Sequence, residues 1–70
     1  MVNEKVEAIE RLPIVEARTG LKKSALYGLV REHKFPAPVP ITGKAKGWLR
    51  SEVSAWIQER VAARDTGGAA

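Results

Sequence analysis

One stretch of the sequence decides the fold: Thr19-Gly20-Leu21-Lys22-Lys23-Ser24-Ala25-Leu26-Tyr27. It predicts a tight turn that leads directly into a short helix, because glycine accepts the left-handed conformation in which helices often end. The new helix should run from about Lys22 to His33. Its buried face should carry Leu21, Ala25, Leu26, Leu29 and Val30, which recur at helical spacing. Its exposed face should carry Lys23, Ser24, Tyr27, Gly28 and Arg31.

Residues before this turn predict a strand and a helix. A short strand is expected near Ile9–Leu12. A helix should cover Pro13–Thr19, because a proline suits the first helical position, where its missing N–H would be unpaired anyway. This helix should bury three side chains: Ile14, Val15 and Ala17.

Residues after the turn predict a β-ribbon. Prolines at alternate positions exclude a helix over Phe35–Ile41 and remove N–H donors from a single edge of the extended strand. The free edge should pair with Ala45–Leu49 across the turn Thr42-Gly43-Lys44, with Val39 and Ile41 facing the core.

The C-terminal part predicts one more helix, which should run to about Arg64. Ser51 is expected to cap it, and Glu52 suits the positive end of the helix dipole. Its buried stripe should contain Val53, Trp56, Ile57 and Val61. We interpret Trp48 and Trp56 as core residues and not as platforms for base stacking.

The order helix, turn, helix, β-ribbon, helix predicts a mainly α chain with a small β-ribbon, which is a winged helix-turn-helix. The expected organisation is an arm over residues 1–11, a domain over residues 12–64 and a disordered tail over residues 65–70.

Composition excludes several classes of protein. The 70 residues include no cysteine and a single histidine, His33, so neither a metal site nor a Ser/His/Asp or Cys/His catalytic set can be built. Gly43-Lys44 is not a phosphate-binding P-loop, because Ala45 stands where Ser or Thr is needed. No signal core or membrane-spanning run is visible. We therefore expect a cytoplasmic protein with no enzyme activity, cofactor, metal, membrane partner or small-molecule substrate.

Positive charge is confined to the middle of the chain. Residues 17–50 have a net charge of +7, whereas residues 1–16 and 51–70 have net charges of −2 and −1. Such sorting indicates a surface that faces a polyanion, and double-stranded DNA is the expected partner.

Seven short motifs, in this order and at this spacing, resemble the AlpA family of small regulators from prophages and other mobile elements. They are Arg11-Leu12-Pro13, Thr19-Gly20-Leu21, Ser24-Ala25-Leu26-Tyr27, Phe35-Pro36 with Pro38, Gly47-Trp48, Ser51-Glu52-Val53 and Ala55-Trp56-Ile57. The resemblance covers roughly residues 10–64. It implies a winged helix-turn-helix related to MerR-type and phage excisionase domains, which binds DNA in transcriptional control or prophage excision. It also implies a nucleoid-associated protein of bacterial or phage origin. The sequence departs from the family at Lys22, where Ser is usual, and at Gly28, where a larger residue, often Arg, is usual.

The helix Lys22–His33 should therefore enter the major groove, and the ribbon tip, residues 42–46, should act as the wing. The candidate DNA-binding residues are Lys22, Lys23, Ser24, Tyr27, Arg31, Lys34, Thr42, Lys44 and Lys46. Lys23 and Arg31 can offer paired donors to guanine, whereas Lys22 and Lys34 suit phosphate. Tyr27 can either touch DNA or pack its ring against the ribbon.

Three functions remain open at this point. The first is a sequence-specific transcriptional regulator, and the second is an excisionase-like architectural factor that bends DNA for a recombinase. The third is a protein-interaction adaptor with a basic face. Further partners can include a second copy of the chain, as a dimer or a cooperative oligomer on DNA, a recombinase or RNA polymerase.

Overall fold

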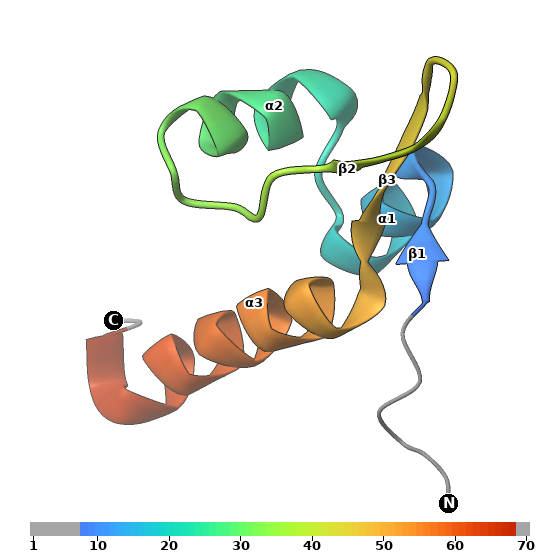
Figure 1. Cartoon of the computed structure of the whole chain (residues 1–70). Coiled ribbons are helices and arrows are strands. Elements are labelled where there is room, and N and C mark those ends of the chain that lie inside the picture. The colour runs from blue at the N-terminus through green and yellow to red at the C-terminus, as the bar shows by residue number, and fades with distance from the viewer. Residues whose placement is uncertain (1–7, 69–70) are drawn as a thin grey trace, which may run out of the picture.

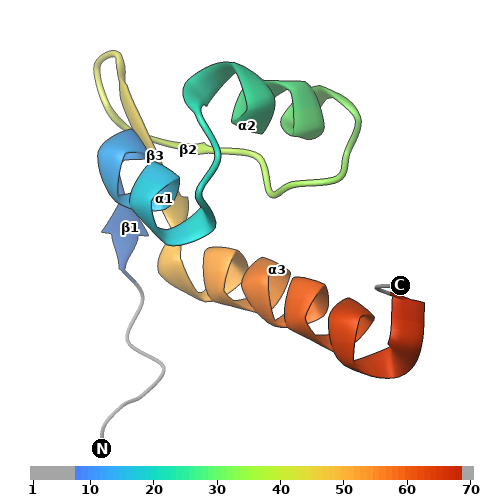
Figure 2. The same ribbon diagram turned by 180° about the vertical axis from the view of Figure 1, so that it is seen from behind.

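The computed structural model describes residues 8–68 and has three α-helices and a small antiparallel sheet. In chain order the elements are β1 (Ile9–Glu10), α1 (Leu12–Thr19), α2 (Lys23–Arg31), β2 (Val39–Thr42), β3 (Ala45–Leu49), α3 (Arg50–Ala63) and a π-helical turn, η1 (Arg64–Gly68). Helix α2 and the ribbon tip lie on one side of the molecule, and α3 lies on the other (Figures 1 and 2). The predicted winged helix-turn-helix is confirmed.

The turn between α1 and α2 forms where the sequence predicted it. Gly20 follows α1 in the left-handed conformation (φ 79°), and its N–H bonds the carbonyl of Glu16 at 2.8 Å. The hydroxyl of Thr19 donates to the carbonyl of Val15 at 2.8 Å and accepts the N–H of Leu21 at 3.2 Å. The side chain of Thr19 therefore fixes both the end of α1 and the chain that leaves it.

Helix α2 ends in a bend that the sequence did not predict. His33 has φ 61°, and its N–H bonds the carbonyl of Val30 at 3.0 Å, while the N–H of Lys34 bonds the carbonyl of Leu29 at 2.8 Å. This pair of bonds is a Schellman motif with histidine in the position that glycine usually takes. The helix is thereby two residues shorter at its C-terminal end than predicted.

The sheet has the order β1-β3-β2, so β3 is central and β2 is an edge strand. The ribbon β2–β3 turns through Gly43 and Lys44, with Gly43 at φ 53°. The register shifts between Pro40 and Thr42, which indicates a bulge. Because a bulge interrupts the alternation of side chains along a strand, Ile41 is 42% exposed, and the prediction that it faces the core was wrong.

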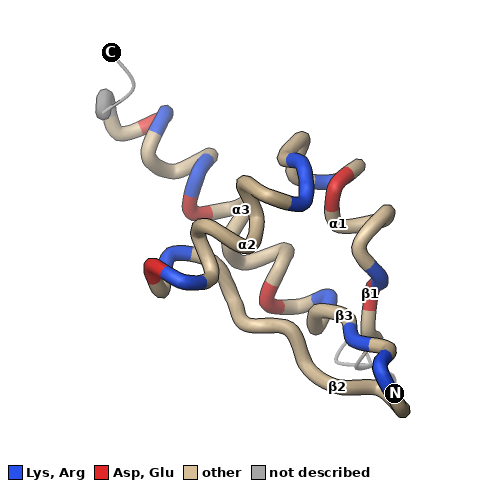
Figure 3. Tube along the Cα trace, turned by 90° about the horizontal axis from the view of Figure 1, so that it is seen from above, with Lys and Arg blue, Asp and Glu red and all other residues tan. Residues whose placement is uncertain are grey.

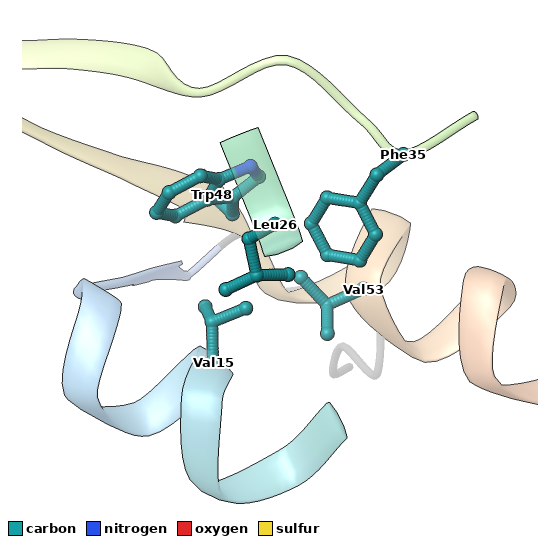
Figure 4. Packing of buried hydrophobic residues seen from close by; sticks show 5 residues of the cluster. All are labelled: Val15, Leu26, Phe35, Trp48 and Val53. Carbon is teal, nitrogen blue, oxygen red and sulfur yellow. The ribbon is translucent and has the colours of Figure 1, made fainter. Parts of the chain in front are cut away.

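Five side chains form the core: Val15, Leu26, Phe35, Trp48 and Val53. They come from all three helices, β3 and the loop before β2, and they point toward one another (Figure 4). The indole N–H of Trp48 donates to the carbonyl of Pro36 at 2.8 Å. The ring of Phe35 meets the edge or face of both tryptophans, with centroids 6.3 Å from Trp48 and 5.1 Å from Trp56. Trp48 is thus a core residue as predicted, whereas Trp56 packs against the core and stays partly exposed.

Three predicted core positions in the helices are also on the surface. Ile14 is 50% exposed, and Ala17 and Ala25 are also exposed. A straight stripe of spacing three and four runs through Leu12, Val15 and Thr19 in α1 and through Leu26, Leu29 and Val30 in α2. Ile14 and Ala25 each lie a single position from that stripe, which turns the side chain by about 100°. Ala17 lies two positions from both Val15 and Thr19, which puts it on the opposite side of α1.

Helix α3 begins two residues earlier than predicted, at Arg50, and Ser51 is inside it instead of capping it. The N–H of Arg50, which has no partner within the helix, bonds the carbonyl of Ala8 at 2.7 Å. The chain before β1 thus satisfies the start of α3. At the other end, the structure has a π-helical turn over Arg64–Gly68, where the sequence predicted disorder from residue 65 onward. Residues 1–7 of the predicted arm and residues 69–70 of the predicted tail lie outside the described residues.

Candidate nucleic-acid interface

Six of the nine candidate DNA-binding residues line two neighbouring grooves. Viewed from above, Lys and Arg are found at both ends of α2, at the ribbon tip and just before α1 (Figure 3). The side chains from Lys22, Lys23, Ser24, Arg31, Lys34, Thr42, Lys44 and Lys46 are exposed. The ninth candidate, Tyr27, is half-buried.

A groove between α2 and the ribbon brings together residues from three distant parts of the sequence. We call it the wing groove, and it is lined by Arg11, Leu12, Pro13, Lys23, Tyr27, Lys44, Lys46 and Trp48. Four of the predicted site residues therefore share one groove with a cation that the sequence did not single out, Arg11. Among the described residues, no acidic side chain lines it, so its charge is uniformly positive.

A second groove runs between α1 and α2 and shares two residues with the first. We call it the helix groove, and it is lined by Glu16, Lys22, Lys23, Ser24 and Tyr27.

Helix α2 starts in this groove, and its own side chains do not stabilise its N-terminal end. Lys22 is the N-cap but gives no side-chain hydrogen bond, and the first turn contains no acidic residue. The N-terminal N–H groups of α2 thus lack a capping side chain, and a helix end of this kind favours an anion.

Tyr27 lies where the two grooves meet. Its ring centroid is 5.7 Å from that of Trp48, with the rings inclined at 62°. The ring therefore packs against the ribbon, as one of the two interpretations from the sequence expected, and contact of Tyr27 with DNA stays a prediction. Trp48 fixes one side of the ring, and the rest of the side chain lines both grooves.

Three predicted residues lie outside both grooves: Arg31, Lys34 and Thr42. Arg31 is in the last turn of α2, and Lys34 follows its C-terminus. The ammonium group of Lys34 is 3.6 Å from a carboxylate oxygen of Glu32, in an exposed pair that screening makes weak. The positive surface therefore has a concave part, formed by the grooves, and a separate part at the far end of α2.

Two arginines have positions that the sequence did not predict. Arg11 was left among the acidic residues 1–16, although it lines the wing groove. No local signal in the sequence places Arg11 beside the next helix, because its position depends on the pairing of β1 with β3. Arg18 was counted in the basic block, but its guanidinium donates to Glu10 at 2.6 Å and to the hydroxyl of Ser54 at 2.7 Å. Arg18 is thus part of the scaffold.

No site for a metal ion appears in the described part of the chain. Residues 8–68 hold no cluster of three or more His, Asp or Glu side chains that could bind a metal ion. None of the helices described is long and apolar enough to cross a bilayer.

Comparison with known proteins identifies the family. The model of the family described as prophage CP4-57 regulatory protein (AlpA) matches residues 8–61. The chain belongs to the AlpA family. It is also 43% identical over 61 residues to the uncharacterized protein ORF88 of Enterobacteria phage P4, across 87% of this chain and 69% of that protein. No solved structure matches the chain significantly.

The AlpA match spans β1, both helices of the helix-turn-helix, the ribbon and most of α3. Both grooves fall within it.

The structure also shows how much space surrounds the unusual Gly28 of α2. A Cβ added there would meet only the guanidinium of Arg31, at an ordinary 3.9 Å. A larger side chain at this position has room, so Gly28 is not required by packing.

Proposed function

We propose that this protein is a sequence-specific DNA-binding regulator of transcription, with α2 in the major groove of duplex DNA and the ribbon tip on the neighbouring backbone or minor groove. The observation that carries the proposal is the meeting of Lys23 from α2 with Lys44 and Lys46 from the ribbon along one uniformly positive groove. A helix and a wing that share one cationic surface match the docking mode of helix-turn-helix proteins. The family description as a prophage regulatory protein supports a role in regulation.

The two positive parts of the surface suit different tasks. The grooves offer lysines and the open start of α2, which are ligands for phosphate. Arg31 stands exposed in the last turn of α2, away from the grooves, where a planar guanidinium can pair with guanine. We infer that the grooves position the protein on DNA and that the outer face of α2 reads bases.

A duplex titration at several salt concentrations tests the proposal. Binding that releases counterions from phosphate weakens linearly on a plot of log affinity against log salt concentration, with a slope of about −0.9 for each phosphate neutralised. We expect such a steep dependence, and a tighter complex with a site selected from random duplexes than with a scrambled one. No binding at low salt, or a flat response to salt, would show that the basic face serves another partner.

A further inference from the structure

We infer that Arg11 is a DNA-backbone clamp, which contacts one strand in the wing groove together with Lys23 of α2 and the ribbon lysines. The inference rests on the proposed function and adds to it a third contact element, the start of α1, besides α2 and the wing.

The ion pairing of the cations supports this inference. Among the described residues, Arg18, Lys34 and Arg64 form ion pairs with Glu10, Glu32 and Asp65. The four cations of the wing groove, which are Arg11, Lys23, Lys44 and Lys46, form none with any described acidic residue. Their mutual repulsion is therefore not balanced inside this part of the chain. Such an arrangement costs folding free energy and favours an anionic occupant that supplies several negative charges.

The position of Arg11 in the fold also supports the inference. It is the N-cap of α1 and directly follows β1, which pairs with β3 through Glu10 and Trp48. This pairing places Arg11 beside β3, the strand that also contains Lys46. Because Lys23 comes from α2, the groove holds cations on separate elements, and an extended polyanion can contact all of them at once.

The close fit between β1 and β3 fixes the position of Arg11. A Cβ on Gly47 would lie 2.6 Å from the carbonyl oxygen of Glu10 and 2.6 Å from a methyl group of Ile9. Only glycine allows this approach of the two backbones. The start of α1 is therefore held at a fixed distance from the ribbon, as a clamp requires.

The test compares Arg11→Gln with Arg50→Gln by fluorescence anisotropy on one labelled duplex over a range of salt concentrations. Arg50 is a matched control because it is an exposed arginine that does not line the groove. We expect Arg11→Gln to weaken binding to preferred and scrambled duplexes by the same factor and to reduce the salt slope by about 0.9. Arg50→Gln should leave affinity and slope unchanged, and circular dichroism should give the same melt for both variants and the wild type.

Two outcomes would overturn the inference and leave the proposed function standing. One is wild-type affinity and slope for Arg11→Gln. The other is a loss confined to the preferred duplex, which would make Arg11 a base-reading residue. Displacement of the duplex by polyglutamate at equal charge concentration would instead indicate an acidic peptide as the occupant. Failure of the wild-type protein to bind any duplex would overturn the proposed function itself.

Discussion

The guanidinium of Arg18 connects two elements that are far apart in the sequence, because it donates to Glu10 in β1 at 2.6 Å and to Ser54 in α3 at 2.7 Å. The side chains of Arg18 and Glu10 are only 28% and 14% exposed. Replacing Arg18 by Met would leave the carboxylate of Glu10 without this partner in a largely dehydrated position. We expect Arg18→Met to lower the free energy of unfolding by about 1–3 kcal/mol, measured by denaturant titration.

The control for this prediction is Lys34→Met, because Lys34 and Glu32 form a pair whose side chains are 68% and 61% exposed. Its loss should change stability by less than about 1 kcal/mol. Equal destabilisation by both variants would contradict the structural role assigned to Arg18.

Gly28→Ala should stabilise the protein. Alanine is favoured over glycine inside a helix by about 0.8–1.0 kcal/mol, and the added Cβ has ordinary contact with a single atom of Arg31. For a domain of this size we expect a rise in melting temperature of roughly 4–8 °C, followed by circular dichroism. A lower melting temperature would mean that Gly28 has a packing role that the structure does not reveal.

Gly47→Ala should have the opposite effect. Its Cβ would overlap the carbonyl oxygen of Glu10 and a methyl group of Ile9, both 2.6 Å away. The strands must separate or bend, which typically costs about 1–3 kcal/mol. Gly28→Ala and Gly47→Ala make the same chemical change in one protein, so the difference between their melting temperatures isolates the close approach of β1 to β3. Similar melts for the two variants would rule out the described pairing.

The sequence allowed the order of elements to be predicted because the strongest local signals lie at their boundaries. Gly20 is required by its positive φ, and the alternate prolines confine β2 to an edge of the sheet. Details that depend on distant residues were out of reach. The bulge at Ile41 and the contact between Arg50 and Ala8, which replaces a cap by Ser51, are set by tertiary packing.

The candidate site was predicted in part for the same reason. Helical spacing places Lys23 and Tyr27 on one side of α2, so their proximity follows from the sequence. No local pattern in the sequence indicates that Arg11 lies near Lys23 and Tyr27, or that Arg18 forms an ion pair with Glu10. Both facts depend on the pairing of β1 with β3. Because β1 has only two residues, it gives almost no periodic signal.

Glu16→Gln should strengthen DNA binding. Glu16 is the acidic residue in the helix groove, beside Lys22, Lys23 and Ser24. Its negative charge opposes a phosphate at the start of α2, and glutamine removes that charge at nearly the same size. Affinity for preferred and scrambled duplexes should rise together at low salt, and the gain should shrink as salt rises, because screening weakens interactions between exposed charges. Glu59→Gln on α3, outside both grooves, is the control and should bind as the wild type does.

Arg31→Ala and Lys44→Ala should weaken DNA binding in different ways. Arg31 is exposed in the last turn of α2 and lies outside the grooves, where it can reach base edges, and a paired contact with guanine is worth about 1–3 kcal/mol of discrimination. Its loss should therefore weaken the preferred site more than a scrambled duplex. Lys44 is in the turn between β2 and β3 and lines the wing groove, where phosphate is the expected neighbour. Its loss should weaken all duplexes by the same factor and reduce the salt slope by about one unit.

Competition binding with preferred and scrambled duplexes separates these outcomes for Arg31 and Lys44. Both variants should keep the wild-type melt, because both side chains are exposed. If Arg31→Ala lowers the two affinities by the same factor, Arg31 contacts phosphate. Base reading must then come from Lys23, Tyr27 or the wing, and α2 must enter the major groove with its N-terminal end closest to the bases.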